Sequence, residues 1–562
     1  MKHQIREQIH RAIQSAFGID FGLEKIRVDY PPEGKGDFAT NVALLLTKEV
    51  GKIPMEVAEK IKNIIQSSAF PSRQQVAEIP QSQAFFEKIE VAKPGFINFY
   101  LSKEALQLEV EKINEEKNNF GNSKIGQGKK IHLDFVSANP TGPVHIGNAR
   151  GGPLGDTLAK VLEKVGYKPY REYYVNDAGN QIEILGHSIL GDEKSQYNGN
   201  YISEVRKKLK VYSEKVRPFP SDSPAVGIPQ GRTLNVRKIG EEAVGVIMKE
   251  IIKSSMEKFG IRFDNYFSEK KLQESGKVDE VINILKEKGF LYEKEGALWF
   301  KSTKFGDDKD RVVVKSNGEK TYFGSDIAYH KEKLDRGFDK LIDIWGADHH
   351  GEVKRTKGAL EALGYKDKLD VILTQFVRVL KGGKEVKMSK RAGTYVSIDD
   401  LIDEAGCDAT RFFFLMYSPD THMNFDMDLA REKSEKNPVY YVQYAHARIC
   451  SILRKAENPK LSLGDIPRLS LEKLHLKERA LIFELSKFPD LVEEISQNYA
   501  VHHLPQYAIG LADKFHSFYD ECRVIDENNL ELTVARLETV KAAQIVLAEV
   551  LRLMGISAPE KM

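Results

Sequence analysis

Apolar positions in the first 115 residues change their spacing several times, which predicts a small α+β unit. Helical spacing marks the opening segment, where the apolar residues are Ile5, Ile9, Ala12, Ile13 and Ala16. We expect a strand over 25–30, helices over 38–50 and from Pro54 onward, and a strand hairpin over 86–91 and 96–101. A long polar helix would then lead out of this unit.

Beyond the Gly-, Asn-, Ser- and Lys-rich segment 121–130, the pattern becomes one of strands alternating with helices. Strands are predicted over 131–136, 170–175, 341–346 and 371–380. The helix after the first strand has apolar residues at helical spacing: Leu154, Leu158, Val161, Leu162 and Val165. Such an order predicts a parallel sheet with ligands at the carboxyl ends of its strands.

Two further features complete the predicted organisation. Segment 191–235 turns polar and then Pro-rich, which indicates an insertion on the sheet scaffold. From about Met427 no strand pattern remains, and helices are predicted over 439–453 and 534–554. The sequence therefore predicts a multidomain α/β protein, divided into domains at 1–120, 121–426 and 427–562.

Composition narrows the setting of this chain. Its 562 residues exceed what one hydrophobic core accommodates. The 84 Lys and Arg nearly balance the 82 Asp and Glu, so any polyanion would have to bind a local basic surface. The cysteines, Cys407, Cys450 and Cys522, are odd in number and lack CxxC spacing, which argues against disulfides and a thiolate zinc site. The charged N-terminal helix lacks the apolar core of a signal peptide. We expect a cytoplasmic monomer that does not contact a membrane.

The run SANPTGPVHIGNARGGPLGD, which follows the first predicted strand of the sheet, is the first candidate for chemistry. Its glycines and prolines predict an irregular turn, and the helix that follows would point its positive end at a bound phosphate. His145 and Asn148 would offer hydrogen-bond donors beside it. Taken alone, the run leaves two interpretations open: a phosphate-binding turn, or an ordinary turn with a packed histidine.

A basic loop far downstream, VLKGGKEVKMSKRAGTYVSIDD, favours the phosphate interpretation. It follows an apolar strand, and Ser397 is the expected N-cap of the next helix. Its charges lie close together in the chain: Lys381, Lys384, Lys387, Lys390 and Arg391. A charge run is usually a solvated face. A pair of loop ammonium groups nevertheless suits a pyrophosphate leaving group, on which charge grows in the transition state.

HIGN at 145–148 and KMSK at 387–390 resemble the two signature motifs of class I aminoacyl-tRNA synthetases. The family's usual fourth residue in the first motif is histidine, whereas Asn148 donates a hydrogen bond but cannot become cationic. Further blocks resemble the arginyl-tRNA synthetases: SANPTGPVHIGNARG, YYVNDAGNQI, FGIRFDNYFSE, TYFGSDIAYH, WGADHHG, KMSKRAGTYVSIDDL, NPVYYVQYAHARI and LRLMGISAPEKM. GDFATNVALLL resembles their N-terminal domain, which binds the tRNA elbow.

This resemblance implies a Rossmann-like catalytic domain that binds ATP and L-arginine. The implied ATP-binding residues are His145, Gly147, Asn148, Lys387, Met388, Ser389 and Lys390, of which His145, Asn148, Lys387 and Lys390 would be catalytic. The implied arginine-binding residues are Asn139, Glu269, Tyr322, Asp326, Asp348 and His349. Carboxylates suit the always-charged guanidinium, and Tyr322 and Asp326 stand four residues apart, on one face of a helix start.

Two of these assignments have alternatives. His349 and its neighbour His350 could suggest a metal site, but zinc needs more ligands than this pair and Asp348 supply, so we expect no tightly bound metal. Glu269 and Asp326 could each be surface helix charges.

The implied reaction has two steps. Arginine and ATP, with Mg²⁺ on the phosphates, give arginyl-adenylate and pyrophosphate, and the terminal ribose of tRNA(Arg) then takes the arginyl group. For this family the resemblance also implies that adenylate formation waits for bound tRNA. The helical tail would read the anticodon, and Tyr440, Tyr444 and Arg448 share one predicted helix face, opposite Val442, Ala445 and Ile449. Packing between helices is the alternative for this stripe, above all for Tyr440.

Three rival functions can be compared with this one. A small-molecule nucleotidyltransferase would not need the N-terminal unit or the helical tail. A non-catalytic tRNA-binding relative would not need KMSK, His145 and the acidic set. A synthetase for an apolar or thiol amino acid would gain nothing from burying Glu269 and Asp326.

Overall fold

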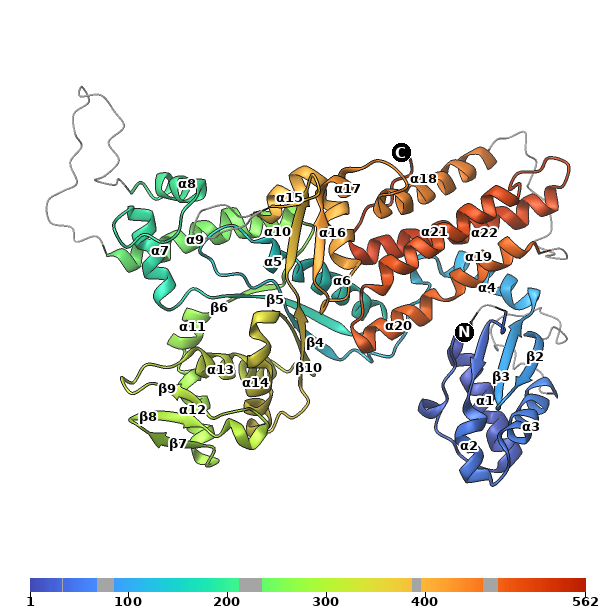
Figure 1. Ribbon diagram of the computed structural model, residues 1–562, viewed down its shortest axis with the longest axis horizontal. Helices are drawn as coiled ribbons and strands as arrows, with labels where there is room; N and C mark the ends of the chain where they lie inside the picture. The colour runs from blue at the N-terminus through green and yellow to red at the C-terminus, as the bar shows by residue number, and fades with distance from the viewer. Residues whose placement is uncertain (33, 68–84, 212–234, 387–395, 458–473) are drawn as a thin grey trace.

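The computed structural model describes residues 1–32, 34–67, 85–211, 235–386, 396–457 and 474–562. Figure 1 shows an N-terminal unit (blue), a central parallel sheet with an attached lobe, and a bundle of long C-terminal helices (orange to red). In the described part of the chain, no helix is both long enough and apolar enough to cross a membrane.

The N-terminal unit packs three helices on a three-stranded antiparallel sheet of order β1-β3-β2. Its elements are α1 (Lys2–Phe17), the 3-10 turn η1 (Leu23–Lys25), β1 (Phe38–Thr40), α2 (Val42–Val50), α3 (Pro54–Ser67), β2 (Phe86–Ala92) and β3 (Phe96–Leu101). The predicted hairpin and the helix from Pro54 are confirmed. The long polar helix is also present, as α4 (Lys103–Glu116), and the short η2 (Lys117–Asn119) follows it.

Two expectations for this unit are wrong. Residues 25–30 form one isolated bridge, between Asp29 and Ala39, and no strand. The alternating side chains of Ile26 and Val28 are buried, but the backbone of this segment does not pair as a strand. The predicted helix over 38–50 begins only at Val42, after the N-cap Asn41. The three residues of β1 pair with β3 instead, which buries Phe38 and Thr40.

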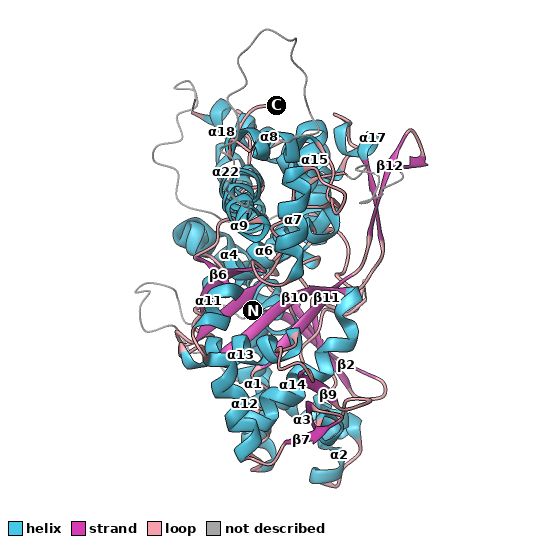
Figure 2. Cartoon of the chain, turned by 90° about the vertical axis from the view of Figure 1, so that its left-hand side faces the viewer, coloured by secondary structure: helices cyan, strands magenta, loops and turns pink. Residues whose placement is uncertain are grey.

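The central sheet has five parallel strands in the order β11-β10-β4-β5-β6, which confirms the predicted fold class. The strands are β4 (Lys130–Asp134), β5 (Lys168–Val175), β6 (Asn265–Ser268), β10 (Lys340–Gly346) and β11 (Leu369–Thr374). Helix α6 (Gly151–Lys164) packs on β4, β5 and β10 from one side, and α13 (Tyr322–Asp335) and α14 (His350–Leu363) lie on the other (Figure 2). The carboxyl ends of the strands therefore share one edge.

A lobe between β6 and β10 was missed by the sequence prediction. It contains α11 (Glu269–Glu274), α12 (Lys277–Glu287), η4 (Ser302–Phe305) and an antiparallel sheet of β7 (Leu291–Lys294), β8 (Ala297–Phe300) and β9 (Arg311–Val314). These strands have four residues each, too few for a periodicity to stand out. The lobe has its own hydrophobic core, which includes Leu285, Phe300 and Phe323.

The run 371–380 is two strands in different sheets, which corrects the single strand expected there. The chain leaves β11 at Thr374 and enters β12 (Val377–Lys381), which pairs with the short β13 (Lys384–Glu385) and with β14 (Met423–Asp426). The Gln375 N–H donates to Pro419 O at 2.8 Å, outside the parallel sheet, so the ladder ends there. Figure 2 shows β12 extending away from the sheet beside α17 (Met427–Arg431).

Helices surround the remainder of the sheet domain. They are α5 (Ile146–Ala149), α7 (Asn180–Leu190), α8 (Asn200–Lys208), α9 (Val236–Val246), the π-helical turn η3 (Ile247–Ile252), α10 (Lys253–Lys258), η5 (Ala347–His349), α15 (Ile398–Ala405) and α16 (Cys407–Leu415). Helices α7 and α9 cross closely, since a Cβ on Gly240 would lie 1.9 Å from Ile182 O. Part of the predicted insertion, residues 212–234, lies outside the described residues.

The C-terminal part is helical, as expected, with α18 (Pro438–Ala456), α19 (Leu476–Ser486), α20 (Phe488–Asn498), α21 (His503–Glu521) and α22 (Leu530–Met554). A buried ion pair fastens it to helix α6, since Lys164 Nζ lies 2.8 Å from Glu549 Oε1. Arg411 of α16 adds a second link, because it pairs with Asp156 of α6 and donates to Met554 O of α22 at 2.8 Å. The N-terminal unit contacts the same bundle, because Arg479 donates to both carboxylate oxygens of Asp37 at 2.9 and 2.6 Å.

Candidate active site

The turn after β4 holds His145 as the N-cap of α5. The His145 Nδ1 accepts a hydrogen bond from the Gly147 N–H at 3.1 Å, which assigns the proton of the neutral ring to Nε2. Asn148 is exposed one turn into the helix. The backbone continues in helical geometry through Arg150 into α6, so one helical unit begins at His145.

The backbone before this turn is strained. Val136 and Ser137 have φ angles of 68° and 35°, a left-handed conformation that a β-branched residue rarely adopts. The Ser137 hydroxyl donates to Asp134 Oδ1 at 2.6 Å and accepts from the Tyr174 N–H at 3.0 Å, which holds the conformation in place. The strained turn leads to Asn139, which is exposed at the carboxyl edge of the sheet.

The chain that flanks the KMSK segment pairs with this same turn. Ile398 N–H donates to Val144 O at 3.0 Å, and Ile146 N–H donates to Val396 O at 3.4 Å. Ser397 begins α15 with the expected N-cap, in a capping box with Asp400. Lys387, Met388, Ser389 and Lys390 lie outside the described residues, but the described chain resumes at 396, and Ser397 pairs with His145.

Arg150 is a buried cation that the sequence reasoning missed. Its guanidinium is held by backbone carbonyls: it donates to Gln375 O and Thr421 O at 2.8 Å each, and to Ser418 O at 2.9 Å. Burial lowers its pKa to about 10. Arg150 therefore ties the helix of the first motif to the base of β12 and β14. Backbone carbonyls have no sequence signature, so the only sign of this role in the sequence is that Arg150 lies two residues after HIGN.

Glu269 and Asp326 form an acidic pair at the carboxyl edge of the sheet. Glu269 is the first residue of α11 and is 1% exposed. Burial, and then the negative charge of Asp326, raise the pKa of Glu269 to about 7. Burial also raises the pKa of Asp326, on α13, to about 6. Within the described ranges neither carboxylate has an ion-pair partner, so the negative charge of this pair is left for a cationic ligand to neutralise.

Tyr322 extends the same pocket. It begins α13, four residues before Asp326, so the predicted shared helix face is confirmed. The ring is 59% exposed, and its hydroxyl lies over Gly179, where a Cβ would approach it to 2.9 Å. A side chain at position 179 would therefore displace the Tyr322 hydroxyl.

Asp348 and His349 follow β10, on the exposed side of the pocket. His349 Nδ1 lies 2.9 Å from Glu352 Oε2, and this partner raises the pKa of His349. Their side chains are 67% and 51% exposed. In the chain as described, no group of three His, Cys, Asp or Glu residues could hold a metal ion. The charge of His349 also acts on Asp326, so it lies close enough to affect the pocket.

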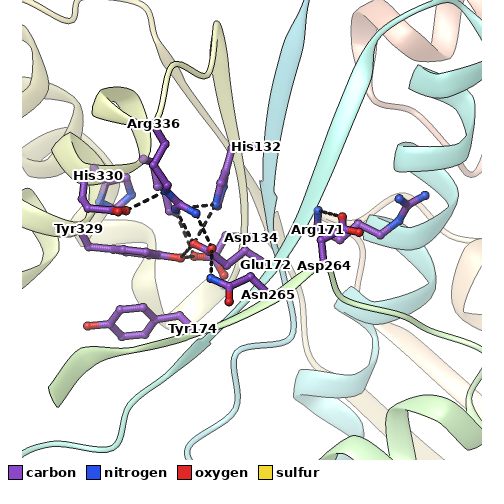
Figure 3. A network of polar contacts seen from close by, with 12 residues as sticks. His132, Asp134, Arg171, Glu172, Tyr174, Asp264, Asn265, Tyr329, His330 and Arg336 are labelled. Carbon is purple, nitrogen blue, oxygen red and sulfur yellow. Dashed lines mark hydrogen bonds and ion pairs between the residues drawn. The ribbon is translucent and has the colours of Figure 1, made fainter. Parts of the chain in front are cut away.

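A buried polar network underlies the pocket, and the sequence reasoning missed it as well (Figure 3). Lys333, on α13, is fully buried between Asp134, at 3.0 Å, and Asp343, at 3.1 Å. The Tyr329 hydroxyl donates to Asp134 at 3.0 Å and to Glu172 at 2.8 Å. Helix α13 is thus fastened to β4, β5 and β10, which fixes Asp326 relative to the sheet.

Glu172 itself is the centre of the part drawn in Figure 3. Its carboxylate receives two hydrogen bonds from Arg336, at 2.7 and 2.8 Å, and lies 2.9 Å from His132 Nε2. These partners hold the pKa of Glu172 far below its usual range even though the residue is buried. The network is therefore a structural support, and its charges are internally paired.

A separate aromatic surface lies on the C-terminal helices. Tyr440 and Tyr444 stack with their ring centroids 6.4 Å apart, and Arg448 donates to the Tyr444 hydroxyl at 2.7 Å, which confirms the predicted shared face. Val442, Ala445 and Ile449 are buried on the other side. Helix α21 adds two residues that the sequence reasoning missed: His516 stacks on Tyr444, and the Arg448 guanidinium lies 4.5 Å from the Tyr519 ring centroid.

Comparisons with known proteins agree along the whole chain. Residues 3–101 match the family described as arginyl tRNA synthetase N terminal domain, residues 109–415 match the catalytic domain of tRNA synthetases class I (R), and residues 442–562 match the DALR anticodon binding domain. Arginine--tRNA ligase 1 of Halalkalibacterium halodurans is 43% identical, over 100% of this chain and 99% of the relative. Arginine--tRNA ligase of Bacillus subtilis is 42% identical with the same coverage.

A solved structure shows the same fold. The arginyl-tRNA synthetase of Thermus thermophilus superimposes with a TM-score of 0.74 at 22% identity, over 100% of both chains. The fold, the first motif at the sheet edge and the matches over the full length lead to one conclusion. The chain belongs to the arginyl-tRNA synthetase family of class I aminoacyl-tRNA synthetases.

Proposed function

We propose that this chain is an arginine--tRNA ligase, which activates L-arginine with ATP and transfers the arginyl group to the 3′-terminal ribose of tRNA(Arg). The observation that carries the substrate assignment is the pair formed by buried Glu269 and half-buried Asp326, which has no ion-pair partner in the described chain. Guanidinium is permanently charged and presents five donors in a planar fork, so it matches two carboxylates better than an ammonium does.

In the first step, a carboxylate oxygen of arginine attacks the α-phosphorus of ATP. The bond between the α-phosphorus and the bridging oxygen breaks, and pyrophosphate leaves. We assign His145 Nε2 and Asn148 as donors to phosphate oxygens, assisted by the positive end of the helix that begins there. Lys387 and Lys390 would stabilise the departing pyrophosphate. Mg²⁺ would enter as the counter-ion of the ATP phosphates.

In the second step, the terminal 2′-hydroxyl of tRNA attacks the arginyl carbonyl, and AMP leaves. No protein nucleophile is needed, because positioning and electrostatic stabilisation carry both steps. Asn139 would hold the ammonium or carboxylate of arginine, Tyr322 would close the mouth of the pocket, and Asp348 and His349 would stand at its rim. Adenylate formation would require bound tRNA.

The aromatic surface supports contact with the anticodon. Tyr440, Tyr444 and Arg448 present stacking and donor groups of the kind that read unstacked bases. The unit 1–120 would contact the tRNA elbow, and the monomer would work in the cytoplasm, where translation uses its product. Membership of the family over the full length argues against the small-molecule nucleotidyltransferase.

The substrate assignment is tested by charging tRNA(Arg) with radiolabelled arginine. Asp326→Asn should raise the KM for arginine by at least tenfold, roughly the cost of losing a charge-assisted hydrogen bond, and leave the KM for ATP within twofold. Glu361→Gln, at an exposed position of α14, is the matched control. An unchanged KM for arginine in Asp326→Asn would remove the acidic pocket from the proposal.

A further inference from the structure

Two neutral polar groups from two different elements act on the Glu269 carboxylate. Gln273, one turn later on α11, donates from Nε2 to Glu269 Oε1 at 3.0 Å. The phenol of Tyr174, on β5, lies close enough to the same carboxylate to lower its pKa. Neither group carries a positive charge, so both orient the carboxylate without neutralising it. A lysine or arginine in either place would occupy the site that a cationic substrate needs.

Gln273 also spans the two helices that carry the acidic pair. Besides Glu269, its Nε2 reaches Ser325 Oγ at 3.4 Å, and Ser325 is the buried neighbour of Asp326 on α13. One amide group therefore links α11 to α13 at the point where both present a carboxylate. The contact sets the separation of Glu269 and Asp326.

Tyr174 is itself fixed in place. Its ring packs on Tyr329 with centroids 4.5 Å apart and stacks on Phe267 at 6.2 Å, and Figure 3 shows it beside Tyr329. Tyr329 is anchored in turn to Asp134 and Glu172. The phenol hydroxyl therefore has little freedom, and the position of the Glu269 carboxylate follows from the buried network beneath it.

We propose that Tyr174 and Gln273 are positioning residues that hold Glu269 as an oriented, uncompensated anion facing Asp326, so that the pocket accepts guanidinium and rejects its neutral ureido analogue. This inference rests on the proposed arginine site. Charge discriminates here because a neutral ureido group would leave the buried carboxylates unpaired.

The surrounding charges make the effect visible in a pH profile. Asp326 and Asp177 raise the pKa of Glu269, whereas the hydrogen bonds from Tyr174 and Gln273 lower it. Burial and the charge of Glu352 raise the pKa of Asp326, whereas His330 of the same helix and Arg355 and His349 of other elements lower it. Removing the phenol hydroxyl therefore raises the pKa of Glu269, and the pH at which arginine binding is half lost must rise with it.

The experiment compares Tyr174→Phe and Gln273→Met with wild type. Each should raise the KM for arginine by about tenfold, as expected for a hydrogen bond to a charged group, with kcat and the KM for ATP within twofold. The acidic limb of kcat/KM for arginine should move to higher pH in Tyr174→Phe. Inhibition by citrulline, the ureido analogue, should weaken less than arginine binding does. Tyr170→Phe, a phenol deletion on the same strand face, should leave all five quantities unchanged.

Several outcomes would overturn the inference. An unchanged KM for arginine in both variants would do so. Equal losses in arginine binding, ATP binding and kcat, with the acidic limb of the pH profile unmoved, would also do so, because they would indicate a merely structural role. Glu269→Gln, measured in parallel, separates this failure from that of the proposed function. If Glu269→Gln loses arginine binding and the two variants do not, only the positioning role is wrong. If Glu269→Gln binds arginine normally, the arginine site and this inference are both wrong.

Discussion

Glu269→Gln should make the substrate-free protein more stable while it removes arginine binding. The wild-type carboxylate is buried beside Asp326, and in the described structure it has neutral donors as its hydrogen-bond partners. The amide of the variant keeps an acceptor oxygen for Gln273 and Tyr174. It also turns a donor toward Asp326, so it replaces a charge repulsion with a hydrogen bond.

The expected size follows from the pKa of Glu269, which rises from 4.5 to about 7. A carboxyl whose pKa is higher in the folded state favours the folded protein in its protonated form. Its destabilising effect is therefore absent below about pH 4.5 and complete above about pH 7. The shift corresponds to about 3 kcal/mol of unfolding free energy, at about 1.4 kcal/mol for each pH unit.

The assay is thermal unfolding of wild type and Glu269→Gln at pH 5 and pH 8, with and without arginine. At pH 8 the variant should melt several degrees higher than wild type, and at pH 5 the difference should shrink to about a quarter of that. Because a chain of several domains does not unfold in one step, the transition of the sheet domain is the one to compare. Arginine should raise the transition of wild type only.

Two results would refute this reasoning. A variant less stable than wild type at pH 8 would mean that the ionised carboxylate is compensated in the folded protein. An equal gain at pH 5 and pH 8 would mean that the effect comes from packing and not from charge. Glu361→Gln serves as the control, because this residue is exposed on α14.

Further predictions concern affinity, support, catalysis and tRNA. Arginine should bind roughly 20-fold more weakly at pH 6 than at pH 8, because Glu269 and Asp326 must lose protons with pKa values of about 7 and about 6; calorimetry that finds a flat profile would contradict this. Lys333→Met should cost about 3–5 kcal/mol of unfolding free energy, since two carboxylates lose their buried partner. Urea unfolding measures this loss, and a value below about 1 kcal/mol would contradict the role of Lys333 as a buried ion-pair partner. Lys390→Ala should lower the adenylation rate far more than tRNA affinity, so equal losses would refute its role. Tyr444→Ala should reduce discrimination against an anticodon mutant of tRNA(Arg), and an unchanged charging ratio in a folded variant would exclude the contact.

The sequence predicts best what depends on local spacing. Tyr322 and Asp326 share a face because both lie in one helix, and Ser397 caps the next helix through a serine and an aspartate three residues apart. The parallel sheet was predictable because buried strands and amphipathic helices alternate. The role of Glu269 came from family resemblance, since nothing in local spacing brings it to Asp326, 57 positions away in numbering.

Contacts that involve backbone atoms or distant partners escaped prediction. Arg150 binds three carbonyls from two remote segments, and carbonyls are the same in every residue. Lys333 looked like an ordinary helix charge until the fold placed Asp134 and Asp343 around it. The strand predicted over 25–30 is wrong although its signal was local, because alternating apolar residues can be buried without pairing as a strand.

Arginine-dependent exchange between ATP and pyrophosphate is the measurement that tests the central claim most directly, with and without tRNA(Arg). The account predicts exchange with arginine when tRNA is present, none with citrulline, and none with arginine when tRNA is absent. Exchange without tRNA would retain arginine activation and contradict the requirement for tRNA. A folded protein that binds tRNA(Arg) but gives no arginine-dependent exchange would contradict the proposed function.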